Sequence, residues 1–266
     1  MLRTVFLKSL RDQRKPLMWW GVGAVALTLV TILFYPVFSQ ATDLSLLLED
    51  SPEAVTRLFA GGFTDFTSPE GWLNSQLFVL MLPSMFFVYA IAQGSAAIAG
   101  EEERGTLDLL LSVPMTRSRV LAHKSAAMVV SLLGLAFLSW LGIVIGAIIV
   151  DMDIGLGRAA QAILSSLLLG VVFGAFATAM GCATGKRGLS IGMASGVVVV
   201  SYLANALGPL VDALDPVTKL SPFYYYISAD PLSNGLNPVH VAVLVGTAGI
   251  LFAISAVTFE RRDLAV

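Results

Sequence analysis

The residues of this sequence best suited to chemistry are a glycine-lysine turn at 181–187 and a charged stretch at 100–124. A phosphate-binding loop needs a glycine, four residues and then Gly-Lys-Ser/Thr, so that backbone amides and the lysine surround the phosphates. The 181–187 turn has one residue too few between its glycines, and Arg187 stands where the hydroxyl is needed. We interpret it as a turn at a helix end and expect no nucleotide site in this chain.

The remaining titratable and nucleophilic residues offer no catalytic arrangement. His123 and His240 lie at the edges of apolar stretches, where a surface position is a simpler interpretation than a proton relay. Cys182 is the only cysteine, which excludes an internal disulfide framework and a cysteine metal site. The sequence has neither a His-Glu-x-x-His motif nor a nucleophile elbow. We therefore expect no enzyme activity and no cofactor or metal in the chain itself.

Composition places the chain in a membrane. Hydrophobic residues make up 56% and charged residues 13%, with a mean hydropathy of +0.82, whereas a soluble domain has about a quarter charged residues. Apolar stretches of roughly 20 residues predict transmembrane helices. We predict an all-α integral membrane protein in which residues 1–266 form one polytopic domain. The expected spans are 16–39, 76–99, 125–150, 158–182, 188–211 and 239–258.

The charged stretch at 100–124 connects spans two and three. Its acidic residues would occupy the first turn of a helix, where they favour the positive end of the helix dipole; they are Glu101, Glu102 and Glu103. Leu107, Leu110 and Leu111 then share one face by helical spacing. The stretch predicts a short amphipathic helix between two spans. A solvated loop lying on the lipid headgroups is the alternative.

The second half of this connection contains a stop and a start signal. Pro114 ends the first helix near Val113, because the residue before a proline is pushed out of the α region. Thr116 can cap a second helix, which begins at Arg117 and continues into span three.

The amino-terminal 15 residues form a basic amphipathic segment. Its apolar face would carry Leu2, Val5, Phe6 and Leu10, and its polar face Arg3, Lys8, Arg11, Arg14 and Lys15. Such a segment suits a helix on the cytoplasmic membrane surface, attracted by anionic lipid. A positive flank that orients the first span is a compatible second interpretation. Pro16 is expected at the first position of span one.

The outer connections are polar and rich in turn residues. Residues Glu53–Ala60 predict a short surface helix, with Ser51 as its cap and Pro52 at the first position. Pro83 predicts a kink in span two. The aromatic run 223–226 fits an interfacial or re-entrant segment better than a free loop.

Basic residues are distributed unequally between the two sides of the predicted bundle. With both termini on one side, that side holds 13 of the 16 Lys and Arg residues: Arg3, Lys8, Arg11, Arg14, Lys15, Arg104, Arg117, Arg119, Lys124, Lys186, Arg187, Arg261 and Arg262. The positive-inside rule therefore predicts cytoplasmic termini and a cytoplasmic 100–124 connection. The other side holds 11 of the 18 acidic residues and is distinctly acidic.

The predicted spans have no Asp, Glu, Lys or Arg well inside them. Ion-driven transporters normally carry an intramembrane ionisable group, and voltage sensors need membrane-embedded arginines. If the protein transports a substrate, we expect its energy to come from outside the membrane.

Glycine spacing suggests how the spans pack. Span five repeats glycine every four residues, at Gly188, Gly192 and Gly196, and shorter repeats occur at 142/146 and 170/174. Small residues at this spacing let helix backbones approach closely, within one bundle or between two copies. Mildly polar side chains in spans two and five suit either a neutral cavity or helix-to-helix hydrogen bonds.

The 101–124 stretch resembles the loop between the second and third spans of ABC-2-type transporter permeases, an exporter-like family. The residues that carry this resemblance are Glu102, Glu103, Arg104, Gly105, Thr106, Leu107, Leu109, Leu110, Leu111, Val113, Pro114, Arg117, Ser118, Arg119 and Lys124. The basic amino end, the six spans, the 221–225 segment and the tail at 259–263 also fit, so the resemblance covers the whole chain.

The resemblance implies that 101–111 is a coupling helix and that 2–15 is an interface helix. Both would dock on separate ATPase subunits, which bind ATP and magnesium, and two permease copies or homologous permeases would pair around a central path. Some relatives resemble the permease of the copper-enzyme maturation system, which serves periplasmic partners, and the acidic outer face is compatible with an extracytoplasmic partner protein.

We therefore predict a permease subunit of an ABC exporter in a prokaryotic inner or plasma membrane, without a nucleic-acid partner. A channel or secondary carrier that acts alone is one alternative, disfavoured by the lack of charges in the spans. A membrane-embedded assembly subunit is the other, disfavoured by the lack of a catalytic arrangement.

Overall fold

The computed structural model describes residues 5–39, 52–63, 65, 67–107, 115–210 and 218–262. Within these ranges the chain is helical without strands, and six helical stretches are long and apolar enough to cross a membrane. They are α1 (Val5–Phe38), the α4–α5 stretch (Pro69–Ala97), α8 (Arg117–Val150), α9 (Leu156–Thr184), α10 with the 3₁₀ turn η2 (Arg187–Leu210) and α14 (Pro238–Arg261). The predicted all-α fold with six spans is confirmed.

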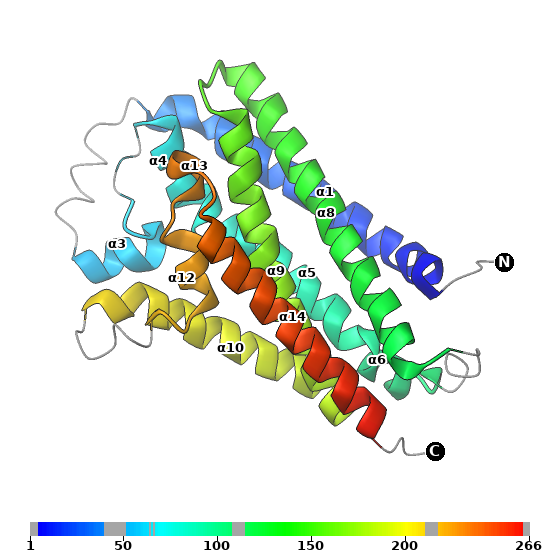
Figure 1. The fold of residues 1–266 in the computed structure, drawn as a ribbon. Helices are drawn as coiled ribbons and strands as arrows, with labels where there is room; N and C mark the ends of the chain where they lie inside the picture. Colours follow the sequence, from blue (N-terminus) through cyan, green and yellow to red (C-terminus); the bar gives the residue numbers. More distant parts are fainter. Residues whose placement is uncertain are drawn as a thin grey trace.

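The central helices are α9 and α5, with α8, α10 and α14 around α9 and α1 alongside α8 (Figure 1). Glycines make the central contact possible. A Cβ added at Gly174 of α9 would lie 2.8 Å from the Ala90 Cβ of α5, and one added at Gly94 would lie 2.3 Å from the Gly174 carbonyl oxygen. Any side chain here would force the two backbones apart. The 142/146 glycines pack in the same way on Thr28 and Ile32 of α1.

The glycines of span five do not pack inside this chain. Gly188, Gly192 and Gly196 are exposed, and a Cβ added at any of them would meet no described atom within 4 Å. Helix α10 packs on α9 through its opposite face, which includes Ser190 and Ala194. Of the two alternatives for the glycine repeat, close packing within the described part of the chain is thus not seen, and packing between two copies stays a prediction.

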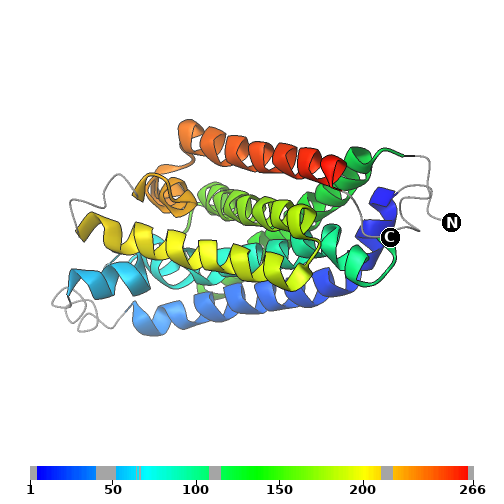
Figure 2. The same cartoon turned by 90° about the horizontal axis from the view of Figure 1, so that it is seen from below.

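Helix α1 runs without interruption through Pro16, which was expected to begin span one. The amino-terminal segment is therefore continuous with the first span. Its first turns, dark blue in Figure 2, bend away from the rest of the helix. A proline inside a helix removes one backbone hydrogen bond and clashes with the preceding turn, which bends the helix rather than ending it here.

Span two begins earlier than predicted, with the short helix α4 (Pro69–Leu73). A π-helical segment, η1 (Asn74–Phe78), follows, and α5 (Met81–Ala97) restarts after a turn at 79–80. Pro83 lies in the first turn of α5, four residues after Val79, whose carbonyl its ring would crowd. The predicted irregularity is thus present, but it precedes the proline.

Short helices cover the end of the bundle opposite the termini. The predicted helix Glu53–Ala60 is present as α3, although Pro52 precedes the helix instead of beginning it. The aromatic run forms α12 (Pro222–Ile227), followed by α13 (Pro231–Asn234). The Tyr226 hydroxyl donates to the Phe78 carbonyl and lies 3.0 Å from Ser166 Oγ. The aromatic run is therefore partly buried in the protein.

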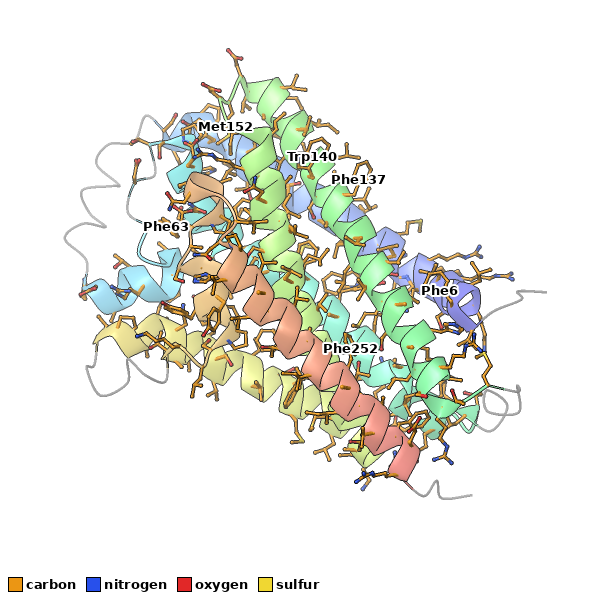
Figure 3. The ribbon with its side chains drawn as sticks, viewed as in Figure 1. Phe6, Phe63, Phe137, Trp140, Met152 and Phe252 are labelled. Atoms are coloured by element: carbon orange, nitrogen blue, oxygen red, sulfur yellow. The ribbon has the colours of Figure 1, made fainter. Side chains whose placement is uncertain are left out.

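Three of the labelled side chains show the two ends of the bundle (Figure 3). Phe6 lies near the termini, whereas Met152 and Phe63 lie toward the opposite end. The described parts of the connection, 98–107 and 115–116, lie at the first end with the turn at 184–187, the start of α1 and the end of α14, as the six-span prediction requires.

Candidate functional site: the acidic triplet at the terminal end of the bundle

The acidic triplet Glu101–Glu103 belongs to the short helix α6 (Ala99–Glu103), which lies at the end of the bundle that carries both termini (Figure 1). The helix ends in a turn at Arg104–Gly105, where Gly105 has φ +64° and its amide donates to the Glu102 carbonyl at 3.0 Å. A glycine in this left-handed conformation typically ends a helix. The expected continuous helix over 101–111 is therefore wrong, and the glutamates lie at the carboxyl end of a helix.

Glu101 is held by a buried ion pair. Its Oε1 lies 2.7 Å from Lys124 Nζ of α8, and these side chains are only 12% and 10% exposed. Thr106 Oγ1 donates to the second carboxylate oxygen, and Arg104 Nη2 lies 3.3 Å from the first. Burial by itself would raise the pKa of Glu101, but the hydrogen bonds from Lys124 and Thr106 outweigh it and hold that pKa at about 2.

Glu102 reaches the carboxyl end of span six. Its Oε1 accepts a hydrogen bond from Arg262 Nη2, and Arg262 Nη1 donates to the Cys182 carbonyl of α9 at 3.3 Å. Gly185 leaves room for this pair, because a Cβ at that position would lie 2.1 Å from Arg262 Nη2. One carboxylate thus joins α6 to the ends of α9 and α14.

Glu103 contacts the start of span five. Its Oε1 accepts a hydrogen bond from the backbone amide of Arg187, the first residue of α10, at 2.7 Å. A carboxylate at this position satisfies an amide that has no partner within the helix and interacts favourably with the helix dipole. The three consecutive glutamates therefore each bind a different spanning helix.

Leu107 lies in the apolar layer beneath the acidic triplet. Its side chain is 4% exposed and belongs to a cluster with Ile98, Val120 and Phe259. Leu107 is therefore buried within the chain, whereas the resemblance to a coupling helix implied a contact with the ATPase. Leu110 and Leu111 lie outside the described residues.

Arg117 also bonds within the chain. Its Nη1 donates to the carbonyls of Phe259 and Arg262, at 3.2 and 2.8 Å, and thereby satisfies carbonyls at the end of α14. Helix α8 begins at Arg117 as predicted, with Thr116 Oγ1 accepting from the Arg119 amide at 3.4 Å.

Four of the remaining predicted interface residues are exposed at the same end: Arg104, Gly105, Lys8 and Arg11. The Arg104 side chain is 56% exposed, and Gly105 is exposed beside it. On α1, Lys8 and Arg11 are exposed and Phe6 is half-buried, while Arg3 lies outside the described residues. The exposed charges at this end are thus mainly basic, although Asp12 and Glu103 are exposed as well, and all three glutamates of the triplet bond within the chain.

Sequence reasoning did not assign roles to the partners of the triplet, Lys124, Arg187 and Arg262. Each lies within two turns of a span end at the terminal side, where three adjacent glutamates also lie. Opposite charges on the same side of the predicted bundle were therefore the signal in the sequence that could have suggested these pairs. Which glutamate meets which base depends on how the helix ends gather.

The sequence matches the ABC-2 family transporter protein family over residues 3–264. The match covers nearly the whole chain, so the protein belongs to this family, as the resemblance at 101–124 indicated. Comparison with curated proteins gives no match. Family membership and the six apolar helices make the chain a multi-pass membrane protein and the membrane component of an ABC transporter.

Proposed function

We propose that this chain is the permease subunit of an ABC exporter in a prokaryotic plasma membrane, driven by separate ATPase subunits that bind ATP and magnesium. The observation that carries the proposal is the acidic triplet of α6. Glu101 binds α8, Glu102 binds the arginine that follows α14, and Glu103 binds the start of α10. A displacement of this short helix would act on three spans together.

The ATPase docks at the end of the bundle that carries both termini, and this end faces the cytoplasm. The basic majority on this side supports that orientation. The docking surface consists of the exposed turn at 104–105 and the basic face of α1, including Lys8 and Arg11. Since this surface is mainly basic, its partner surface on the ATPase is acidic.

Two permease copies pair to complete the transporter. The exposed glycine repeat of α10 supports a contact between copies, because Gly188, Gly192 and Gly196 would let a second helix approach closely. The acidic end opposite the termini is suited to an extracytoplasmic partner.

The proposal is tested by purifying the tagged chain from its native membrane and identifying the proteins that accompany it. We expect a P-loop ATPase whose hydrolysis depends on the permease. Lys8→Glu with Arg11→Glu should weaken ATPase binding roughly tenfold, because two exposed attractions become repulsions.

The matched control is Arg57→Glu with Arg158→Glu, which reverses two charges at the opposite end and should leave ATPase binding unchanged. Purification without any ATPase would contradict the proposal. Equal loss in the control pair would contradict the docking surface.

A further inference from the structure

An apolar groove of about 490 Å³ runs along α1 where this helix meets α8. Most of its lining comes from α1, between Met18 and Leu29, and Leu138 of α8 completes it. Gly21 allows Leu138 to lie against the α1 backbone, because a Cβ added at this glycine would be 2.5 Å from Leu138 Cδ1. Both helices are membrane-spanning at this level, so the occupant of the groove must be apolar along its length.

The groove has the length of one membrane leaflet. Leu29 follows Met18 by 11 residues, which corresponds to about 16 Å along a helix with a rise of about 1.5 Å per residue. Half of a hydrocarbon core that is about 30 Å thick is about 15 Å. One acyl chain can therefore fill the groove, from the end of the bundle that carries the termini to the middle of the membrane.

Two exposed basic residues, Arg14 and Lys15, precede the groove on α1. At about 100° per residue, Arg14 lies about 40° to one side of Met18 and Lys15 about 60° to the other. Neither residue forms an ion pair with any other described residue. The neighbouring Asp12 lines a polar cavity beside Glu101, on another side of α1. The groove thus begins between two positive charges that the described part of the chain leaves uncompensated.

The groove faces away from the helices that contribute to the proposed pairing of two copies. The side of α1 that contacts α5 carries Trp20, whose ring centroid is 6.1 Å from that of Tyr89. Val22 and Leu29 of the groove lie roughly opposite Trp20 by helical spacing. The glycine repeat belongs to α10, which packs on α5 and α9, while α1 lies along one outer side of the bundle (Figure 2). Pairing through α10 therefore leaves the groove facing lipid.

We infer that this groove binds one anionic phospholipid from the leaflet on the side of the termini. An acyl chain lies in the groove between α1 and α8, and the phosphodiester lies between Arg14 and Lys15. Guanidinium and ammonium groups both bind phosphate oxygens, and such side chains near a helix end reach the membrane–water interface. A zwitterionic lipid binds less well, because its own ammonium group is repelled by the two basic residues.

This site differs from the general attraction of the basic amino end to an anionic membrane, since it holds a single lipid at a defined place. It requires neither the ATPase nor the pairing of two copies. Failure of the proposed transport function would therefore leave the inference standing, and its own failure would leave the transport function standing.

The test is native mass spectrometry of the full chain in detergent, with phosphatidylglycerol or phosphatidylethanolamine of the same acyl chains added. The wild-type chain should bind phosphatidylglycerol roughly tenfold more tightly than phosphatidylethanolamine. Arg14→Gln with Lys15→Gln should weaken phosphatidylglycerol binding roughly twentyfold, because each basic residue near an anionic lipid contributes about fivefold in affinity. The matched control is Arg119→Gln with Lys186→Gln, which removes two exposed basic residues at the same end and should bind like the wild type.

A second variant tests the groove itself. Ala26→Phe places a ring where the acyl chain would lie and should weaken phosphatidylglycerol binding about tenfold, because the ring excludes the chain. Its control is Ala253→Phe, at an exposed position of α14 on the opposite side of the bundle, which should bind like the wild type. Ala26 is exposed, so the new ring displaces no buried side chain, and thermal unfolding verifies that every variant folds.

Three results would overturn the inference. The first is unchanged phosphatidylglycerol binding in the folded Arg14→Gln, Lys15→Gln variant or in folded Ala26→Phe. The second is equal binding of phosphatidylethanolamine by the wild-type chain, which would remove the role of the two basic residues. The third is loss of dimer mass in Ala26→Phe with lipid binding intact, which would make a second copy the occupant of the groove.

Discussion

Replacement of Lys124 by methionine tests whether the ion pair between Lys124 and Glu101 of the acidic triplet stabilises the bundle. Methionine keeps the length and apolar stem of lysine but removes its charge. The Glu101 carboxylate then remains largely buried, with only Thr106 and Arg104 as partners. Removal of one member of a buried ion pair costs about 3–5 kcal/mol, chiefly because the other charge is left without compensation.

The two remaining partners of Glu101 place the expected loss at the lower end, about 3 kcal/mol. For a chain of this size, about 2–4 °C of Tm accompanies each kcal/mol, so Tm should fall by roughly 6–12 °C. The double variant Lys124→Met with Glu101→Gln removes both charges and should recover most of the loss, with a coupling energy of about 2 kcal/mol.

The measurement is thermal unfolding of the detergent-purified chain, with Lys186→Met as the control. Lys186 is exposed at the same end, so its loss should change stability by no more than about 0.5 kcal/mol. If Lys124→Met unfolds like the control, the ion pair contributes nothing and the reasoning fails. Additive effects of Lys124→Met and Glu101→Gln would also refute it.

The same assay over a range of pH isolates Glu101. Its pKa is about 2 in the folded chain, against an ordinary value of 4.5. A lowered pKa means that the carboxylate stabilises the fold above about pH 4.5 and that this contribution disappears as pH falls toward 2. Tm should therefore fall over this interval, and less steeply in Glu101→Gln. Parallel curves for the two proteins would show that other groups control acid stability.

Two further predictions concern packing and orientation. Gly174→Leu should destabilise the chain by about 3 kcal/mol or more, because the new side chain would collide with Ala90. Gly192→Leu should leave the Tm of the monomer unchanged and weaken pairing between copies. Equal Tm values for the two variants would contradict this prediction. In a cysteine-free background, Asp153→Cys should react with an impermeant thiol reagent added outside, and Lys186→Cys only after permeabilisation. The reverse labelling pattern would invert the proposed topology.

Hydropathy and local stereochemistry were sufficient to predict the membrane-spanning helices of this protein. Six apolar stretches became six spanning helices, because an unpaired backbone group in hydrocarbon is so costly that a spanning segment must be helical. The predicted helix Glu53–Ala60 has those bounds in the structure, and Thr116 caps a helix beginning at Arg117. These features depend on residues within one turn of each other, and the sequence contains all of that information.

Local rules were insufficient to predict the contacts of residues that depend on how distant helices pack. Pro16 was expected to begin a helix, yet α1 continues through it. The glycine repeat of α10 is exposed, while the shorter repeat at 170/174 packs on α5, because the side of α9 that faces α5 is decided by the whole bundle.

The acidic triplet shows this limit most clearly. Its position next to a span, its charge and its leucine neighbour are all visible in the sequence, and they predicted a surface helix with partner-facing charges. Only the tertiary structure brings Lys124, Arg187 and Arg262 within reach of three adjacent carboxylates. The physical reason is that a buried carboxylate is stable only beside a partner, and that partner comes from helix ends distant in sequence.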